Sequence, residues 1–381
     1  MYLEHLWLTE FRNYRDVELV PAPEGITVIS GANGEGKTNL LEAIAYLATL
    51  RSMRGSPPEA LVRNGAGVAG AVIRAEARRE GRRLLIEAQL QPGGRDRARV
   101  NGLPLRSSAD LLGALHATVF SPDDLALVKG GPQGRRDYLD GVLAALHPRH
   151  QATLVEVERV LRQRNALLKS SGAGPRRPGG GPGRGRPDVP AEVASTLDVW
   201  DHKLATSGEA LASAREQLGA DLAAGVSYAY GYLARAVAHR GRAEVGLRYR
   251  RSWQGSLAGA LAASRADDLR RGVTTIGPQR DDLDLYVGDL PARTHASQGE
   301  QRSLALALRL GGHHLVAGEA GSTPILLLDD VFSELDADRS DALLACLPSG
   351  QAILTTAGEA PPGAVVAARV RVEEGKVLGQ S

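Results

Sequence analysis

The 381-residue chain contains a single cysteine, Cys346, which excludes a framework of internal disulfides. Cys346 lies in the apolar run from Ala342 to Leu347, and we interpret it as a residue of the core. No run of about 18 or more apolar residues occurs, so we expect no helix that crosses a membrane. The segment Met1 to His5 lacks the basic-then-apolar pattern of a signal peptide. Together these features lead us to expect a cytoplasmic protein with no membrane partner.

Aromatic residues are also scarce, at 4%, so a core has to be built from Leu, Val, Ile and Ala. Hydrophobic residues make up 43% of the chain and charged residues 24%, which is ordinary for a soluble globular protein. The formal net charge of +2 neither predicts nor excludes a nucleic-acid partner. A case for DNA binding must therefore come from local clusters of basic residues.

Local patterns predict a mixed α/β part, a helical middle and a second mixed α/β part that begins beyond Gly272. Apolar residues at helical spacing predict a helix from Asn39 to Leu50, and Asn101-Gly102 is typical of a hairpin turn. The predicted strands of the first part are Leu3 to Leu8, Val17 to Val20, Ile26 to Ile29, Val68 to Ala75, Leu84 to Leu90, Ala98 to Val100 and Ala117 to Phe120.

Helical spacing dominates the middle of the chain, from about Arg135 to Lys169 and again from about Ala191 to Arg240. Between them, Ser170 to Pro187 contains no acidic residue and no apolar side chain larger than alanine. Such a composition cannot bury a core, so we predict a flexible loop. Two helices joined by a loop predict an antiparallel hairpin, an arm of about 30 Å that stands off the rest of the molecule.

One segment matches the phosphate-loop pattern G-x-x-x-x-G-K-[ST] in full, between a predicted strand and a predicted helix: Gly31-Ala32-Asn33-Gly34-Glu35-Gly36-Lys37-Thr38. Its glycines let backbone N–H groups face phosphate oxygens, and the helix N-terminus adds partial positive charge. We predict that this segment binds ATP, with Lys37 at the β and γ phosphates and Thr38 on Mg²⁺. A glycine-rich turn without a ligand is the alternative, and the full context disfavours it.

A second motif, Ile325 to Leu328 followed by Asp329 and Asp330, predicts a buried strand with two carboxylates at its end. The carboxyl ends of strands are where open α/β sheets bind ligands. We expect Asp329 to hold Mg²⁺ and Asp330 to orient the attacking water. Without the phosphate loop, the same motif would equally suit a strand end with a helix cap.

A third motif, Ala296-Ser297-Gln298-Gly299-Glu300-Gln301, precedes an apolar helical run. Ser297 with Glu300 is also the pattern of a helix capping box. The motif resembles the signature of ABC-type ATPases, in which a serine hydroxyl and a glycine N–H contact the γ phosphate held by the opposite subunit. By position, Ser297 and Gly299 take those roles, and the resemblance implies that ATP drives homodimerisation.

The spacing of the motifs narrows the resemblance. Lys37 and Ser297 are 260 residues apart (297 − 37), far more than in transporter ATPases. A long insertion between the two halves of the head is typical of the SMC and DNA-repair branch of ABC-type ATPases. Within that branch, the chain resembles the RecF family. The segments that carry this resemblance are Leu8 to Tyr14, Phe120 to Leu125, Gly134 to Asp140 and Gly277 to Asp282.

The resemblance implies an ABC-type ATPase head with a short, mostly helical arm inserted. Residues 1–122 and 276–381 would form the head, and residues 123–275 the arm. It further implies a slow Mg-dependent ATPase of recombinational DNA repair, linked to replication and the SOS response. Closure of the homodimer would clamp duplex, gapped or junction DNA, and recombination mediator proteins would be partners in loading a recombinase. A transporter ATPase subunit and a nucleotide-gated scaffold with negligible catalysis are the alternatives.

The chain departs from the wider ABC pattern at three places. Asp330 replaces the usual catalytic glutamate, Thr355-Thr356 stands where a switch histidine is expected, and no glutamine of a Q-loop is evident. Asp123 or Asp124 is a candidate for the Q-loop role. We still expect Asp330, Lys37 and Ser297 to act in catalysis.

Two clusters of basic residues are candidates for contact with DNA phosphates, although solvated charged faces explain them equally well. One lies in the predicted head: Arg74, Arg78, Arg79, Arg82 and Arg83. The other follows the predicted arm and its loop: Arg162, Arg164, Lys169, Arg176, Arg177, Arg184 and Arg186. The histidines at 147, 150, 313 and 314 lack the framework of a zinc site.

Overall fold

A six-stranded sheet, mostly parallel, joins the two ends of the chain in one layer. Its order is β15-β14-β3-β13-β12-β8, and only the β14–β15 pair is antiparallel. The strands are β3 (Gly25–Ser30), β8 (Ala117–Phe120), β12 (Ile325–Asp329), β13 (Gln351–Thr356), β14 (Val366–Glu373) and β15 (Lys376–Gln380). This computed structural model describes residues 1–67, 70–94, 96–105, 114–172, 190–235 and 244–380. The prediction that both ends of the chain form one α/β head is therefore confirmed.

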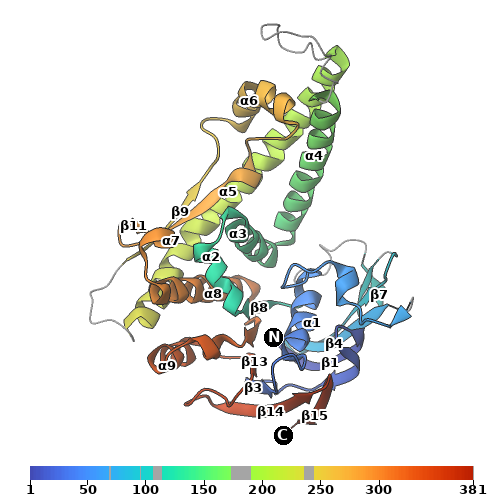
Figure 1. Ribbon diagram of the computed structural model, residues 1–381, viewed down its shortest axis with the longest axis vertical. Coiled ribbons are helices and arrows are strands. Elements are labelled where there is room, and N and C mark those ends of the chain that lie inside the picture. The colour runs from blue at the N-terminus through green and yellow to red at the C-terminus, as the bar shows by residue number, and fades with distance from the viewer. Residues whose placement is uncertain (68–69, 95, 106–113, 173–189, 236–243, 381) are drawn as a thin grey trace.

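Helices cover both faces of this sheet, which explains the unbroken apolar run in β12. Ile325 and Leu327 pack toward α1 (Lys37–Thr49), in the same cluster as its Leu40 and Ile44. Leu326 and Leu328 belong to the opposite cluster, with the buried side of α8 (Gln298–Ala320). The sheet thereby lies between α1 and α8 (Figure 1).

An antiparallel sheet packs on the other side of α1, in the order β2-β1-β4-β5-β6-β7. Its strands are β1 (Tyr2–Phe11), β2 (Tyr14–Leu19), β4 (Ala71–Arg79), β5 (Arg82–Leu90), β6 (Arg97–Val100) and β7 (Leu103–Pro104). Asn101 and Gly102 join β6 to β7 with φ angles of 50° and 77°, so the predicted hairpin turn is confirmed. The predicted strand from Val68 begins at Ala71, and residues 68–69 lie outside the described part.

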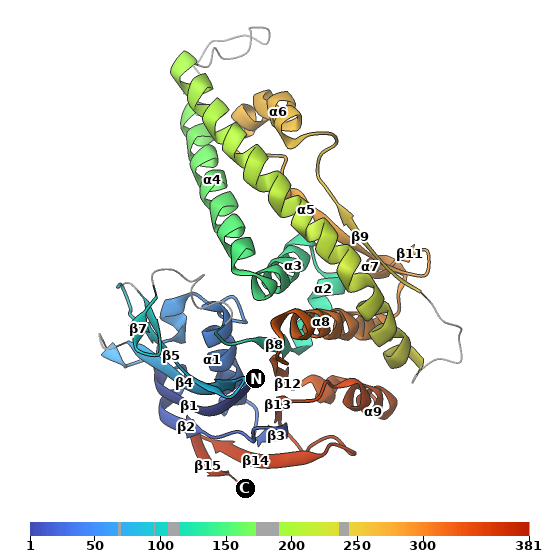
Figure 2. The ribbon, with the colours of Figure 1, turned by 180° about the vertical axis from the view of Figure 1, so that it is seen from behind.

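The predicted helical hairpin is confirmed as α4 (Pro148–Gly172) against α5 (Ala191–Arg235), side by side in Figures 1 and 2. Residues 173–187 of the predicted loop lie outside the described part. At 45 residues, α5 continues past the arm and packs on α8 in the head. A Cβ on Gly311 of α8 would lie 2.7 Å from the Val226 side chain of α5, so glycine allows this close approach. One helix thus belongs to both arm and head.

The remaining elements connect arm and head. A small sheet pairs β9 (Val245–Arg250), β10 (Asp282–Val287) and β11 (Leu290–Pro291), and so crosses the predicted boundary at residue 275. That division into domains stays a prediction. The helices are α2 (Leu125–Lys129), α3 (Pro132–Leu146), α6 (Leu257–Arg271), α7 (Ala292–His295) and α9 (Ala337–Cys346), with short 3₁₀ turns η1 (Pro58–Leu61), η4 (Pro122–Asp124), η5 (Pro278–Arg280) and η6 (Val331–Glu334).

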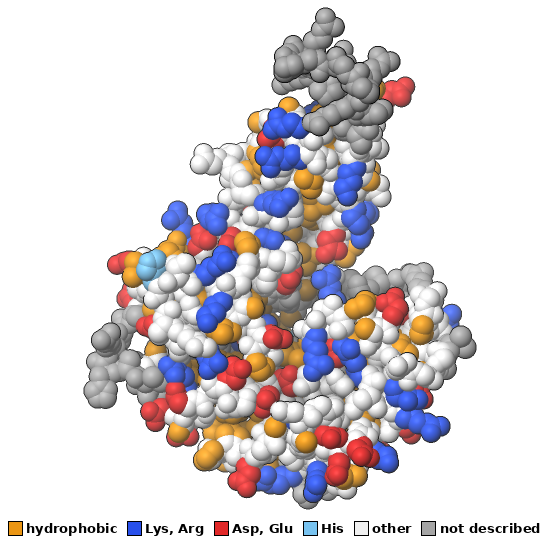
Figure 3. Space-filling model, viewed as in Figure 1, with side chains coloured by type: hydrophobic (Ala, Val, Ile, Leu, Met, Phe, Trp, Pro, Cys, Tyr) orange, Lys and Arg blue, Asp and Glu red, His pale blue; other side chains and the backbone are white. Residues whose placement is uncertain are grey.

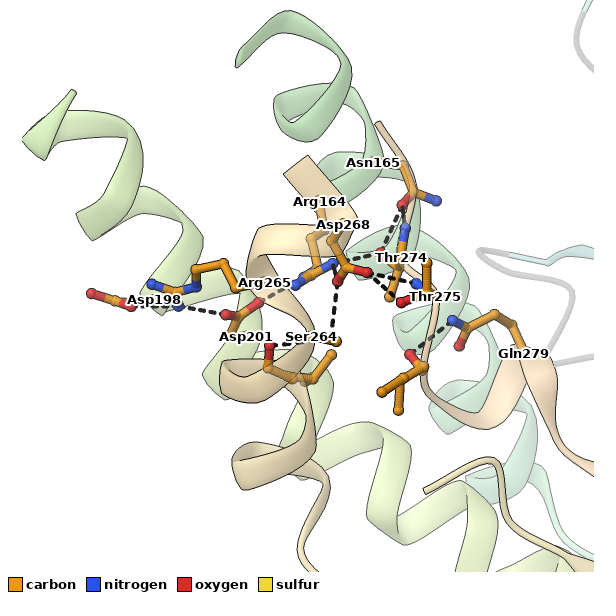
Figure 4. Close-up of polar contacts among 12 residues, drawn as sticks. Arg164, Asn165, Asp198, Asp201, Ser264, Arg265, Asp268, Thr274, Thr275 and Gln279 are labelled. Atoms are coloured by element: carbon orange, nitrogen blue, oxygen red, sulfur yellow. Dashed lines mark hydrogen bonds and ion pairs between the residues drawn. The ribbon is translucent and has the colours of Figure 1, made fainter. Parts of the chain in front are cut away.

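A buried ionic network fastens α6 to the α4–α5 hairpin (Figure 4). The guanidinium of Arg164, which is fully buried, donates to Asp201 of α5 at 2.6 Å and to Asp268 of α6 at 2.7 Å. Arg265 of α6 adds an ion pair with Asp198 at 2.6 Å. The hypothesis that Arg164 contacts DNA phosphates is therefore wrong, because its charge is enclosed and paired within the arm.

Candidate functional site

The phosphate loop, residues 31–38, runs from the carboxyl end of β3 into the first turn of α1. Gly34 and Gly36 have φ angles of 90° and 108°, which favour glycine. A Cβ on Gly31 would lie 2.3 Å from the backbone oxygen of Val372, and one on Gly36 would lie 2.4 Å from the side chain of Asn13. The loop therefore needs its glycines both to curl and to fit between neighbouring segments.

Lys37 places its ammonium against the inside of this loop. Its Nζ donates to the backbone oxygens of Gly31 and Ala32, both at 2.7 Å. Burial lowers the pKa of the Lys37 ammonium, and the charges of Asp330 and Asp329 partly oppose that shift. A charged amine held at the N-terminus of a helix is suited to an anion.

Asp329 lies beside the loop, at the end of the central strand β12. Its Oδ1 accepts hydrogen bonds from the hydroxyls of Thr38, at 2.7 Å, and Thr355, at 2.8 Å. Burial raises the pKa of the Asp329 carboxyl, and these two hydrogen bonds and the charge of Arg54 partly oppose the rise. A hydroxyl and a carboxylate in contact are the hard oxygen donors that Mg²⁺ prefers. The two residues predicted to hold a metal are thus adjacent, and their chemistry fits it.

Asp330 follows Asp329 in a left-handed conformation, with φ 49° and ψ 27°. Its N–H donates to Thr355 through both the side-chain oxygen, at 3.1 Å, and the backbone oxygen, at 3.2 Å. Its negative charge is the strongest of those that raise the pKa of Lys37. Asp330 therefore lies at the same site as the loop lysine.

A turn near the start of the chain donates hydrogen bonds to the phosphate loop. The sequence motifs had assigned this turn no role in the site. The Asn13 side chain donates to the backbone oxygen of Glu35 at 2.8 Å, and the Tyr14 hydroxyl donates to that of Gly36 at 3.0 Å. On the other side, Arg54 donates to the Asn39 side chain at 3.2 Å. The only sequence signal for this support was the segment Leu8 to Tyr14, noted for its family resemblance.

The signature segment forms the predicted capping box at the start of α8. Glu300 donates its N–H to the Ser297 hydroxyl at 3.3 Å, and the Glu300 carboxylate accepts from the Ser297 N–H at 2.7 Å. A Cβ on Gly299 would lie 2.1 Å from the Arg339 guanidinium of α9. In the described part of the chain, Ser297 and Gly299 make no hydrogen bond with residues 31–38.

Other predicted residues have structural partners. The Asp124 carboxylate caps η4 at Ser121 and accepts from Arg309 of α8 at 2.7 Å, so this Q-loop candidate links η4 to α8. His313 is buried against the Thr118 hydroxyl at 3.0 Å. Within the described residues no group of three or more His, Cys, Asp or Glu is placed to hold a metal, and no helix has the length and apolarity to span a bilayer.

The basic cluster of the head lies on the antiparallel sheet, where acidic side chains accompany it. Arg78 donates to Glu4 at 2.7 Å and Arg83 to Glu76 at 3.1 Å. Such pairs weaken the case for this face as a phosphate surface. On the arm, Lys and Arg side chains lie at several separate places on the face shown in Figure 3. Residues 176, 177, 184 and 186 of the predicted arm cluster lie outside the described part.

Comparisons with known proteins agree with this geometry. Residues 2–359 match the family described as the RecF/RecN/SMC N terminal domain. The DNA replication and repair protein RecF of Frankia alni is 43% identical, with 100% of both chains covered, and its counterpart in Streptomyces avermitilis is 43% identical over 99% of each. A solved structure described as the recombination mediator protein RecF with ATP in the RecFOR pathway is 28% identical, covers 100% of this chain and 97% of that chain, and superposes with a TM-score of 0.86. The chain therefore belongs to the RecF family of DNA repair proteins, within the RecF/RecN/SMC group of ABC-type ATPases.

Proposed function

We propose that the chain binds ATP with Mg²⁺ in residues 31–38 and hydrolyses it slowly. The observation that carries this proposal is the 2.7 Å hydrogen bond from Thr38 to Asp329, which brings the phosphate loop and the strand-end carboxylate together. The ATP-bound relative of nearly the same fold supports it. Hydrolysis is expected to be slow because Asp330 is one methylene shorter than the glutamate usual at this position.

Each residue of the site has a role in this proposal. Lys37 exchanges its two backbone acceptors for phosphate oxygens, and residues Gly31, Ala32, Asn33, Gly34, Glu35 and Gly36 surround the phosphates with backbone N–H groups. Thr38 and Asp329 would hold Mg²⁺, which neutralises phosphate charge when bound. Asp330 orients the attacking water beside Lys37.

We further propose that a second copy of the chain completes the site. Ser297 bonds with Glu300 at the start of its own helix, and the N-terminus of α8 carries the partial positive charge that suits a phosphate. The γ phosphate held by one copy would accept from Ser297 and Gly299 of the other. ATP then joins the two copies, and its hydrolysis removes the shared charge and releases them.

The relatives support a proposal for the biological role. Proteins described as DNA replication and repair protein RecF match this chain over its full length. We propose that the ATP-bound homodimer clamps duplex, gapped or junction DNA between its arms and helps recombination mediator proteins load a recombinase. A cytoplasmic location stays a prediction.

Light scattering with ADP, ATP, and ATP plus duplex DNA tests the proposal, together with steady-state ATPase. We expect a dimer only with ATP, and turnover that rises with DNA. Lys37→Met should abolish ATP binding, and Asp330→Asn should bind ATP and remain dimeric. A chain that stays monomeric with saturating ATP and DNA contradicts the clamp. Dimerisation without turnover favours a nucleotide-gated scaffold, and copurification with a membrane protein favours a transporter subunit.

A further inference from the structure

Thr355, at the carboxyl end of β13, contacts both acidic residues of the candidate site through one hydroxyl. It pairs in register with Asp329 of the neighbouring strand β12, and only 1% of its surface is exposed. Its Oγ1 donates to the Asp329 carboxylate at 2.8 Å and accepts from the Asp330 N–H at 3.1 Å. The single hydroxyl therefore bridges a side chain and the backbone of the next residue.

The Thr355 hydroxyl and the last residue of the phosphate loop, Thr38, both donate to the Asp329 carboxylate. The same carboxylate oxygen, Oδ1, also accepts from Thr38 at 2.7 Å. Two hydroxyl donors that converge on one oxygen restrict the rotamer of the carboxylate and favour its ionised form. The orientation of Asp329 thus depends on β13 as much as on α1.

On Asp330, Thr355 fixes the backbone. The Asp330 N–H is shared between the hydroxyl of Thr355 and its backbone oxygen, the latter at 3.2 Å. Asp330 has a left-handed conformation that residues with a Cβ rarely adopt, and its hydrogen bonds have to maintain it. Since the backbone sets the direction of the Cα–Cβ bond, Thr355 also constrains the direction in which the Asp330 side chain leaves the backbone.

We propose that Thr355 is a positioning residue that holds the Asp329 and Asp330 carboxylates as one rigid pair. It stands where the resemblance to ABC-type ATPases predicts a switch histidine, but it acts through the two acids. This inference rests on the proposed ATPase function. It implies that metal binding and the orientation of water are coupled, because one hydroxyl supports the residues assigned to both.

The test compares Thr355→Val, which keeps the shape and removes the hydroxyl, with Thr355→Ser, which restores it. Thr355→Ala serves as a second variant if the valine disturbs folding. Thr27→Val is the matched control, because Thr27 is a fully buried threonine of β3 whose hydroxyl accepts from the Ala22 N–H at 2.9 Å. For each variant, kcat, KM for ATP, the Mg²⁺ concentration at half-maximal rate and their pH profiles are measured.

We expect Thr355→Val to lower kcat and to raise the Mg²⁺ requirement, each by about 10–100-fold, as for other residues that orient metal ligands. KM for ATP should change little because Lys37 and the loop are untouched. Thr355→Ser should recover most of the activity, and Thr27→Val should match the wild type. The inference is overturned if Thr355→Val keeps the wild-type kcat and Mg²⁺ requirement, or if Thr355→Ser is equally impaired. A wild-type protein without Mg-dependent turnover would instead contradict the proposed function itself.

Discussion

The Thr38 hydroxyl and Oδ1 of Asp329 lie 2.7 Å apart although 291 residues separate them in the chain. The contact forms because β3 and β12 lie on either side of β13 in one parallel sheet, so their carboxyl ends meet at the same edge. The arm between them is inserted without disturbing this edge. The central sheet therefore determines how the phosphate loop and the Asp329 carboxylate lie relative to each other.

Replacing Asp329 with asparagine should stabilise the nucleotide-free protein while weakening its response to Mg-ATP. The folded pKa of Asp329 is raised, so folding favours the protonated carboxyl. The stability tied to that proton is fully present below the unfolded pKa and is lost as pH rises through the folded pKa. At neutral pH the wild type carries this cost, whereas asparagine keeps the acceptor for Thr38 without the charge.

We expect Asp329→Asn to raise Tm without nucleotide by about 2–4 °C at pH 7–8 and to lose that advantage toward pH 4. Mg-ATP should raise the wild-type Tm by more than that of the variant, because the variant keeps Lys37 and the loop but loses a carboxylate assigned to Mg²⁺. Thermal unfolding across pH, with and without Mg-ATP, measures both effects. Asp16→Asn, on the exposed side of β2, is the control. The assignment would be contradicted if the Tm difference between the variant and the wild type were smaller at pH 8 than at pH 5.

Ser297→Arg should abolish ATP-dependent dimerisation while ATP binding stays within about twofold, because the proposed ATP-binding residues of the same chain are unchanged. Loss of the helix cap alone should cost about 1 kcal/mol. Ser256→Arg makes the same change at α6, where the Ser256 hydroxyl caps Gly259 at 3.2 Å, far along the arm. Light scattering with ATP and titration with a fluorescent nucleotide separate the two effects. Dimers of Ser297→Arg with ATP would rule out the contact between copies.

Arg164→Met should destabilise the arm by roughly 3–5 kcal/mol, because it leaves the buried carboxylates of Asp201 and Asp268 without their shared cation. Adding Asp268→Asn should recover part of the loss. Arg159→Met is the control, since Arg159 pairs with Glu156 on the surface, where such ion pairs contribute little to stability. Denaturant unfolding gives the free energies. Equal losses for the two arginine variants would show that the network does not fasten α6.

Sequence reasoning succeeded where one local pattern determines the structure. Ile325 to Leu328 could only suit a strand covered on both sides, and Asn101-Gly102 suits the left-handed turn that the structure contains. The capping box of Ser297 and Glu300 is likewise complete within four residues. In each case the residues that decide the conformation are neighbours in the chain.

Sequence reasoning failed where the residues that contact each other are distant in the chain. An arginine on an amphipathic helix is usually exposed, and nothing near Arg164 revealed that Asp268, 104 residues away, would enclose it. The support of the loop by Asn13 depends on the packing of the antiparallel sheet against α1, which no local pattern encodes. The continuation of α5 into the head was also hidden, because helical spacing does not show where a helix changes its partners.

Two buried histidines predict how the head responds to acid. Burial lowers the pKa of both His116 and His313 to about 4, from an ordinary value of 6.5. A depressed folded pKa gives stability that is present above the unfolded pKa and is lost as pH falls through the folded one. Each histidine should therefore remove roughly 3 kcal/mol between pH 6.5 and 4, opposite in sign to the effect of Asp329.

His313→Gln tests this directly, because glutamine retains a polar contact for the Thr118 hydroxyl but cannot take up a proton. Its free energy of unfolding, measured with denaturant from pH 8 to pH 4, should fall less steeply than that of the wild type. His202→Gln, at an exposed position of α5, should follow the wild-type curve. The buried-histidine explanation fails if the His313→Gln curve keeps the full wild-type slope, since the proton taken up on acid unfolding must then bind elsewhere.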